Sequence, residues 1–97
     1  MRECSSLQEV REEVDKLDTQ IVALIAQRNE YIKQAARFKS SVAEVKADDR
    51  IESLIMRLRT QALELGISAN MIEDLFKLMI DEMVETEIAE FRNAKDL

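Results

Sequence analysis

The chain has 97 residues, which suffice for one small domain (1–97), and its lack of proline, single glycine and 35% charged residues predict an all-α fold. With no histidine and one cysteine, Cys4, it lacks the parts of an intrachain disulfide, of the usual metal sites and of histidine-dependent nucleophile systems. The net charge of −6 disfavours nucleic acid as a partner. Because no apolar run reaches about 18 residues and no signal-peptide pattern is present, we expect a cytoplasmic protein without a membrane span.

A long first helix is predicted from about residue 7 to residue 41, with Ser6 and Glu9 as a capping box at its start. Its apolar residues recur at alternating intervals of three and four, which keeps one face toward a partner helix. The stripe consists of Leu7, Val10, Val14, Leu17, Ile21, Leu24, Tyr31, Ala35 and Phe38. A helix of this length spans about 50 Å, far more than a small globule can cover, so a second chain is expected.

Arg28 interrupts this stripe between Leu24 and Tyr31. A guanidinium that is removed from water without a counter-charge is costly. Either the stripe opens to water at this point or something negative meets the arginine. The plainest candidate is an Asp or Glu from another helix, and a bound anion is the other.

Two further basic residues bear on this question. Lys39 lies eleven residues after Arg28, so on one continuous helix the two share a face and lie roughly 16 Å apart along the axis. Arg11 lies about 25 Å below Arg28 and cannot reach the same small anion within its own chain. If two copies pair antiparallel and cross near residues 21–24, Arg11 of the partner subunit approaches Arg28 and Lys39, and a two-fold dimer builds two cationic pockets. The alternative for Arg11 is an ordinary solvated arginine.

A second helix is predicted at about residues 49–65. Asp49 and Glu52 form a capping pair at its start, and Gly66 follows its end, where a left-handed residue is favoured. The preceding segment "SVAEVKA" is expected to be a loop or a frayed turn.

A third helix is predicted at about residues 69–93, with Ser68 as its cap. Its apolar residues cover two adjoining stripes, which indicates a wide buried face. They are Ile72, Phe76, Met79, Ile80, Met83, Val84, Ile88 and Phe91.

Four segments together resemble the all-helical chorismate mutase family across nearly the whole chain. They are "VREEVDKLDTQIVALIAQR", "RFK", "DDRIESL" and "LFKLMIDEMVETEIAEFR". The segment "YIKQAARFK" is most similar to the branch that contains isochorismate pyruvate-lyases. The resemblance implies an intertwined helical homodimer with shared active sites and a reaction that uses no metal and no cofactor.

For the family, the substrate is a small dianion, chorismate, and the product is prephenate. The resemblance assigns Arg28 and Arg11 of the partner subunit to carboxylate binding, Lys39 to the ether oxygen and a carboxylate, and Arg50 to substrate binding at the start of the second helix. Glu87 stands where the family usually has a glutamine that donates to the ether oxygen. Because an ionised carboxylate cannot donate, Glu87 can replace it only when protonated; otherwise it pairs with Lys39.

Two departures favour the lyase branch, which converts isochorismate to salicylate and pyruvate. Ile51 replaces a glutamate that many mutases have after the arginine matched by Arg50, and the interval from Lys39 to Arg50 is one residue shorter than in common mutases. Family breadth favours chorismate mutase, which we therefore take as the main prediction. A third possibility, from another class, is a non-catalytic dimerisation or regulatory module in which Arg11 and Arg28, with Lys39, pair with acidic residues.

Overall fold

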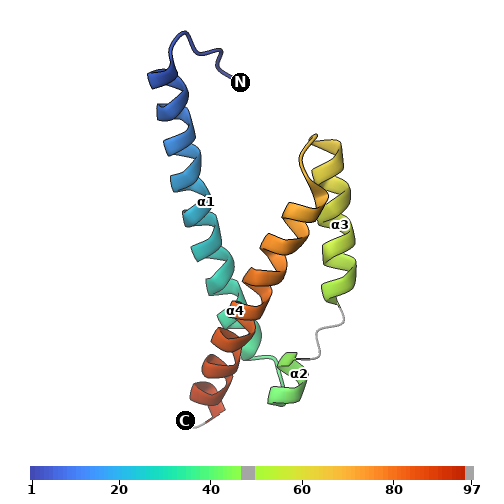
Figure 1. Cartoon of the computed structure of the whole chain (residues 1–97). Coiled ribbons are helices and arrows are strands. Elements are labelled where there is room, and N and C mark those ends of the chain that lie inside the picture. The colour runs from blue at the N-terminus through green and yellow to red at the C-terminus, as the bar shows by residue number, and fades with distance from the viewer. Residues whose placement is uncertain (47–49, 96–97) are drawn as a thin grey trace. The chain divides into compact units, whose positions relative to one another are not determined.

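The computed structural model describes residues 1–46 and 50–95, and in these two ranges the fold is all-α, as the composition predicts. Within them four helices follow one another (Figure 1): α1 (Leu7–Ala36), α2 (Val42–Lys46), α3 (Arg50–Glu64) and α4 (Ala69–Lys95). The chain divides into two units, Met1–Tyr31 and Ile32–Leu97. The first unit holds most of α1, and the second holds its last turn with α2 to α4. The organisation as one domain stays a prediction.

The first unit opens with the capping box that the sequence predicts. The Glu9 amide donates to Ser6 Oγ over 3.1 Å, and Glu9 Oε2 accepts a hydrogen bond from the Ser5 amide at 2.6 Å. Arg2 folds back and forms ion pairs with Glu9 at 2.8 Å and with Glu13 at 3.0 Å. Hydrogen bonds from Ser5 lower the pKa of Glu9, which keeps this carboxylate ionised as a cap.

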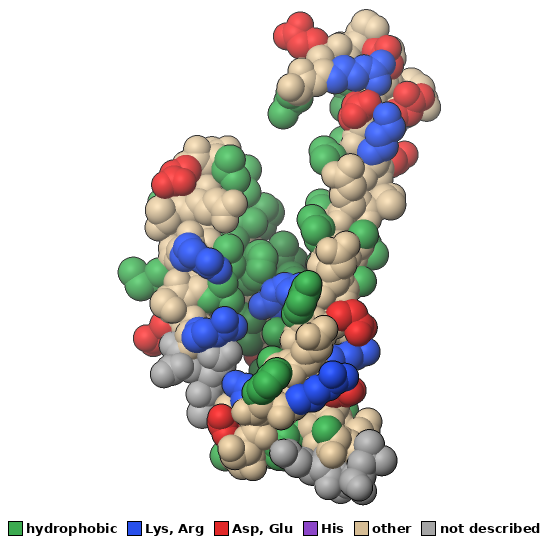
Figure 2. All heavy atoms as spheres, turned by 180° about the vertical axis from the view of Figure 1, so that it is seen from behind, with side chains coloured by type: hydrophobic (Ala, Val, Ile, Leu, Met, Phe, Trp, Pro, Cys, Tyr) green, Lys and Arg blue, Asp and Glu red, His purple; other side chains and the backbone are tan. Residues whose placement is uncertain are grey.

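Apolar side chains follow α1 without being buried. Leu7, Leu17 and Leu24 are 62%, 56% and 61% exposed, and Val10, Val14 and Ile21 are exposed as well. Figure 2 shows hydrophobic side chains spaced along this helix. Large apolar side chains that stay exposed along one helix are typical of a surface that binds a partner.

In the second unit α3 and α4 pack side by side as a helical hairpin (Figure 1). The turn between them is a Schellman motif: the Ile67 amide donates to the Ala62 carbonyl at 2.9 Å and the Gly66 amide to the Leu63 carbonyl at 3.2 Å. Gly66 has a φ of 75°, the left-handed conformation that the sequence predicts for it. At the other end of the turn the Met71 amide donates to Ser68 Oγ over 3.1 Å, which confirms Ser68 as a cap.

A small apolar cluster lies in the second unit where α2 packs against α4. Its buried members are Ala36, Val45, Ile88 and Phe91, and Val42 and Val84 pack against them. Val45 is only 1% exposed. The cluster therefore joins the last turn of α1, the short α2 and the C-terminal half of α4.

The predicted extension of the first helix to residue 41 is wrong, because α1 ends at Ala36. The amides of Arg37, Phe38 and Lys39 each donate to the carbonyl three residues back, at 3.1, 3.0 and 3.3 Å. Bonds of this type tighten and end a helix. Lys39 consequently lies in a turn.

The segment expected to be a loop contains α2, whose five residues start after Ser41. The other helices agree with their predicted bounds to within two residues: α3 spans Arg50–Glu64 and α4 spans Ala69–Lys95. Asp49, predicted as a cap of α3, lies outside the described residues.

Gly66→Ala should lower the free energy of unfolding by about 1–2 kcal/mol, the cost of left-handed backbone in an L-residue. No atom lies within 4 Å of an added Cβ, so a steric clash adds nothing. Gly66→Asn should cost less, because asparagine adopts this conformation more readily. Urea unfolding followed by circular dichroism, at one protein concentration, measures both. An alanine variant as stable as the native chain would contradict the role of the positive φ.

Candidate active site

Lys39 is half-buried in the turn between α1 and α2. Its amide donates to the carbonyl of Ala36, which is 0% exposed. Glu44, on α2, lies close enough for the charge of Lys39 to help lower the pKa of its carboxyl group, after the larger effect of hydrogen bonds from Ser40. The candidate ammonium group thus belongs to a turn whose first residues are hydrogen-bonded to the last turn of α1.

Glu87 lies on α4. Among the residues that the structure describes, it is the charged residue that is buried, with 8% exposure. Its Oε1 atom is fully buried. Buried apolar residues surround it along the same helix: Met83 one turn before, Ile88 directly after and Phe91 one turn later. The burial that a protonated carboxyl group requires at this position is therefore present.

The apolar cluster brings the surroundings of these two residues together. Ala36, three residues before Lys39, and Ile88, directly after Glu87, are members of the same cluster. The chain segments that carry Lys39 and Glu87 thus meet at one packed cluster. Such a pair can stabilise an oxygen on which negative charge develops, by charge from the lysine and by donation from the carboxyl group if it is protonated.

The three candidate arginines belong to different units, Arg11 and Arg28 to the first and Arg50 to the second. Arg11 is exposed and Arg28 half-buried on the part of α1 that belongs to the first unit, and Arg50 is the exposed first residue of α3. Along the continuous α1, Arg11 and Arg28 are about 25 Å apart, so they cannot bind one small ligand in the same chain. The expectation that Arg28 and Lys39 share one helix face is wrong, because α1 ends before Lys39.

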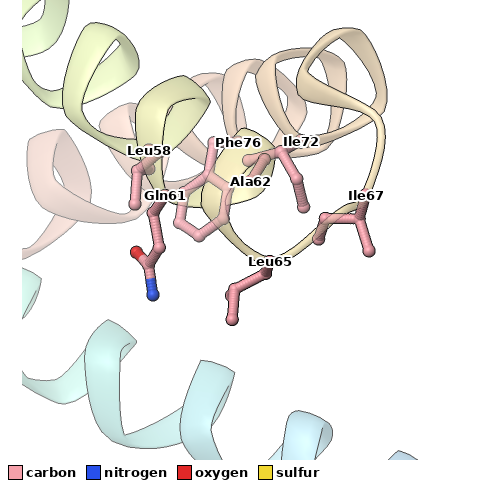
Figure 3. A pocket seen from close by; sticks show the side chains of 7 residues that line it. All are labelled: Leu58, Gln61, Ala62, Leu65, Ile67, Ile72 and Phe76. Carbon is pink, nitrogen blue, oxygen red and sulfur yellow. The ribbon is translucent and has the colours of Figure 1, made fainter.

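An apolar pocket of about 220 Å³ lies elsewhere in the second unit, at the turn between α3 and α4 (Figure 3). It is lined by Leu58, Gln61, Ala62, Leu65, Ile67, Ile72 and Phe76. Gln61 is the only polar side chain in this lining, and no cation takes part. A dianion has no cationic binding partner in this lining, so the pocket does not fit the anionic substrate expected at the active site.

The sequence interpretation missed one feature beside Lys39. Ser41 and Glu44 form a capping box at the start of α2: the Glu44 amide donates to Ser41 Oγ at 3.1 Å, and Glu44 Oε2 accepts from the Ser40 amide at 2.8 Å. The signal was in the sequence, because "SSVAE" repeats the pattern of "SSLQE" at the start of α1.

Neither a metal centre nor a membrane span emerges from the part of the chain that the structure describes. It holds no group of three carboxylate, cysteine or histidine side chains arranged for a metal ion. It also holds no helix that combines the length and the apolar character needed to cross a membrane.

The family model of chorismate mutase type II matches residues 10–88. Isochorismate pyruvate lyase of Pseudomonas aeruginosa is 31% identical over 93 residues, which cover 96% of this chain and 92% of that protein. The T-protein of Haemophilus influenzae is 30% identical over 83 residues, which cover 84% of this chain and 22% of the T-protein. The first relative is thus matched along nearly its whole length, the second over about a fifth.

Proposed function

The chain belongs to the chorismate mutase type II family, and we propose that it rearranges chorismate to prephenate. The observation that carries this proposal is that the family match covers residues 10–88, and hence every candidate site residue from Arg11 to Glu87. The burial of Glu87 supports it, as does the apolar cluster that joins Ile88, the next residue, to Ala36 at the start of the turn that carries Lys39.

The rearrangement makes modest demands on the protein. Within one molecule of substrate a C–O bond breaks while a C–C bond forms, so no atom enters or leaves and the electrons stay within the substrate. The protein must hold a dianion in a folded conformation and stabilise negative charge on the ether oxygen. In the proposed mechanism Lys39 stabilises this oxygen, while Arg28, Arg50 and Arg11 of the partner subunit hold the carboxylates.

Glu87 is proposed to donate a hydrogen bond to the same oxygen. Only a protonated carboxyl group can donate, and burial disfavours the charged form. The 8% exposure of Glu87 and its position among Met83, Ile88 and Phe91 supply the desolvated surroundings that this role requires.

The proposed assembly is a homodimer with shared active sites. The exposed apolar side chains of α1 offer the surface for a second chain, because a helix of 30 residues is too long for a chain this small to cover. The distance of about 25 Å between Arg11 and Arg28 along α1 means that Arg11 serves a site only in another copy.

A second candidate, isochorismate pyruvate-lyase, is favoured by specific observations. The Pseudomonas aeruginosa relative of that name is matched along nearly its whole length. Ile51 supplies no carboxylate at the start of α3, as noted for the lyase branch. Both reactions break an ether C–O bond in a dianion, so the same cations serve either one.

Product analysis decides between the candidates. The purified protein is mixed with chorismate and, separately, with isochorismate, and the products are identified by chromatography. Prephenate from chorismate supports the mutase, and salicylate with pyruvate from isochorismate supports the lyase. Turnover of neither substrate would reject both and favour a non-catalytic dimerisation module.

Lys39→Ala should lower turnover by roughly 10²–10³-fold, by analogy with the loss of one preorganised oxyanion donor. Lys46→Ala is the matched control, because Lys46 is an exposed lysine at the end of α2. Steady-state rates on both substrates measure the effect. Near-native turnover of the Lys39 variant would remove the electrostatic role from this residue.

Mixing two inactive variants tests whether the sites are shared. Arg11→Ala and Lys39→Ala homodimers should each be inactive, but their heterodimer contains one site free of both changes. Random exchange of subunits in an equal mixture should therefore restore about a quarter of native activity. Sedimentation at micromolar concentration, which should show a dimer, completes the test. A stable folded monomer, or a mixture that stays inactive after subunit exchange, would argue against shared sites.

Glu87→Gln should keep activity and flatten its pH profile. If the protonated carboxyl group is the donor, native activity falls as the pH rises and Glu87 loses its proton, whereas glutamine donates at every pH. The variant should therefore gain most, relative to the native chain, above neutrality. A folded, dimeric variant that is inactive at every pH would show that the carboxylate itself is needed.

A further inference from the structure

The position of Lys39 in a turn raises the question of what fixes its side chain. Lysine carries its charge on a flexible four-carbon stem, so a loose backbone would spread the ammonium over many positions. On the N-terminal side of Lys39, the backbone is fixed by the end of α1. The amides of Arg37, Phe38 and Lys39 donate hydrogen bonds to carbonyls of the last helical turn. These bonds fix the backbone as far as Lys39, and Ser40 and Ser41 lie beyond them.

On the other side the turn is held by the capping box of α2. Ser41 Oγ accepts a hydrogen bond from the Glu44 amide, and the carboxylate of Glu44 reaches back to the Ser40 amide. The Val45 amide donates to the Ser41 carbonyl at 3.2 Å, the first hydrogen bond of α2. The residue directly after Lys39 is therefore held by the side chain of Glu44.

The capping box is in turn anchored to the core. A helix of five residues is not stable by itself, so α2 depends on its cap and on packing. Val45 follows Glu44 and is buried against Ala36, Ile88 and Phe91. The box thus connects the residue after Lys39 to the cluster that contains Ile88, the residue after Glu87.

From this geometry we infer that Ser41 and Glu44 are positioning residues for Lys39, which hold its ammonium where charge develops in the reaction. The inference rests on the proposed function, since it presumes that Lys39 acts on the substrate. Preorganisation of a charged group is a large part of electrostatic catalysis, and a displacement of about 1 Å can lower a rate 100-fold.

Glu44 acts here through its hydrogen bonds rather than through its charge. A carboxylate beside a catalytic ammonium weakens the positive field that the substrate meets, so its charge alone would be a disadvantage. The Ser40 amide donates to Glu44 Oε2 at 2.8 Å, and hydrogen bonds from Ser40 lower the pKa of this carboxyl group, as expected for an acceptor. Glutamine accepts in the same capping position without the charge.

Four variants separate positioning from stability. Ser41→Ala and Glu44→Ala break the box and should lower kcat and kcat/KM together, by roughly 10- to 100-fold. Glu44→Gln should restore most of the rate. Ser68→Ala is the matched control: Ser68 Oγ caps α4 with a bond of the same 3.1 Å length, at the end of the hairpin that carries Gly66, and its loss should lower the unfolding midpoint without lowering kcat.

A measurement that does not depend on turnover accompanies the rates. Amide hydrogen exchange of residues 39–44 should accelerate in Ser41→Ala and Glu44→Ala, and should stay near native in Glu44→Gln and Ser68→Ala. Native kcat in both box-breaking variants, or an equal loss in Ser68→Ala, would overturn the inference. Failure of the proposed function would be seen in the native chain instead, as turnover of neither substrate, and the exchange rates would then still decide whether the box orders the turn.

Discussion

The burial of Val45 against Ala36, Ile88 and Phe91 is the interaction on which the candidate chemistry of the second unit depends. Burying one such side chain contributes about 1.5–3 kcal/mol, more than a five-residue helix can gain from its own hydrogen bonds. Because α2 is held by this contact, the chain between α1 and α2 has two fixed ends. Lys39 lies between those ends.

Hydrogen bonds and packing have separate tasks in this arrangement. The bonds that end α1 and the capping box that starts α2 determine the direction in which the backbone leaves each helix. The apolar cluster determines where α2 lies on α4. Both contributions are needed to give Lys39 a defined position. Without the hydrogen bonds the backbone could leave each helix in several directions, and without the apolar cluster α2 would not be held on α4.

The elements that the sequence predicts well are those with strong local signals. Ser6 with Glu9 marks the start of α1, and Gly66 and Ser68 mark the turn between α3 and α4, because capping and left-handed backbone are properties of single residues. The end of α1 has no such marker. The stripe of apolar residues continues through Phe38, so periodicity alone extends the helix past Ala36.

What ends α1 is partly tertiary, which explains why the sequence interpretation failed there. Ser40 and Ser41 compete for the backbone through their side chains, yet serine also occurs inside helices. In the structure α2 is a separate helix and its Val45 is buried in the cluster with Ile88 and Phe91 of α4, a long-range contact that favours the break after Ala36. The same limit applies to the site. The burial of Glu87 agrees with its apolar periodicity on α4, whereas Arg28 and Lys39 lose a common helix face because α1 ends at Ala36. The only local sign of that end is the Ser41 and Glu44 cap of α2, which the apolar stripe through Phe38 outweighed in the prediction.

The same packing also bears on the proton that the proposed mechanism requires. Glu87 precedes Ile88 on α4 and is itself only 8% exposed, so the helix that anchors α2 also carries a carboxyl group removed from water. Desolvation favours its protonated form, whereas a nearby ammonium favours the ionised form. If Lys39 acts on the substrate as proposed, the bound dianion competes for that ammonium and thereby relieves its pull on Glu87. Helix α4 would then serve both residues, by anchoring the turn from which Lys39 extends and by carrying Glu87 at a position dry enough for it to donate.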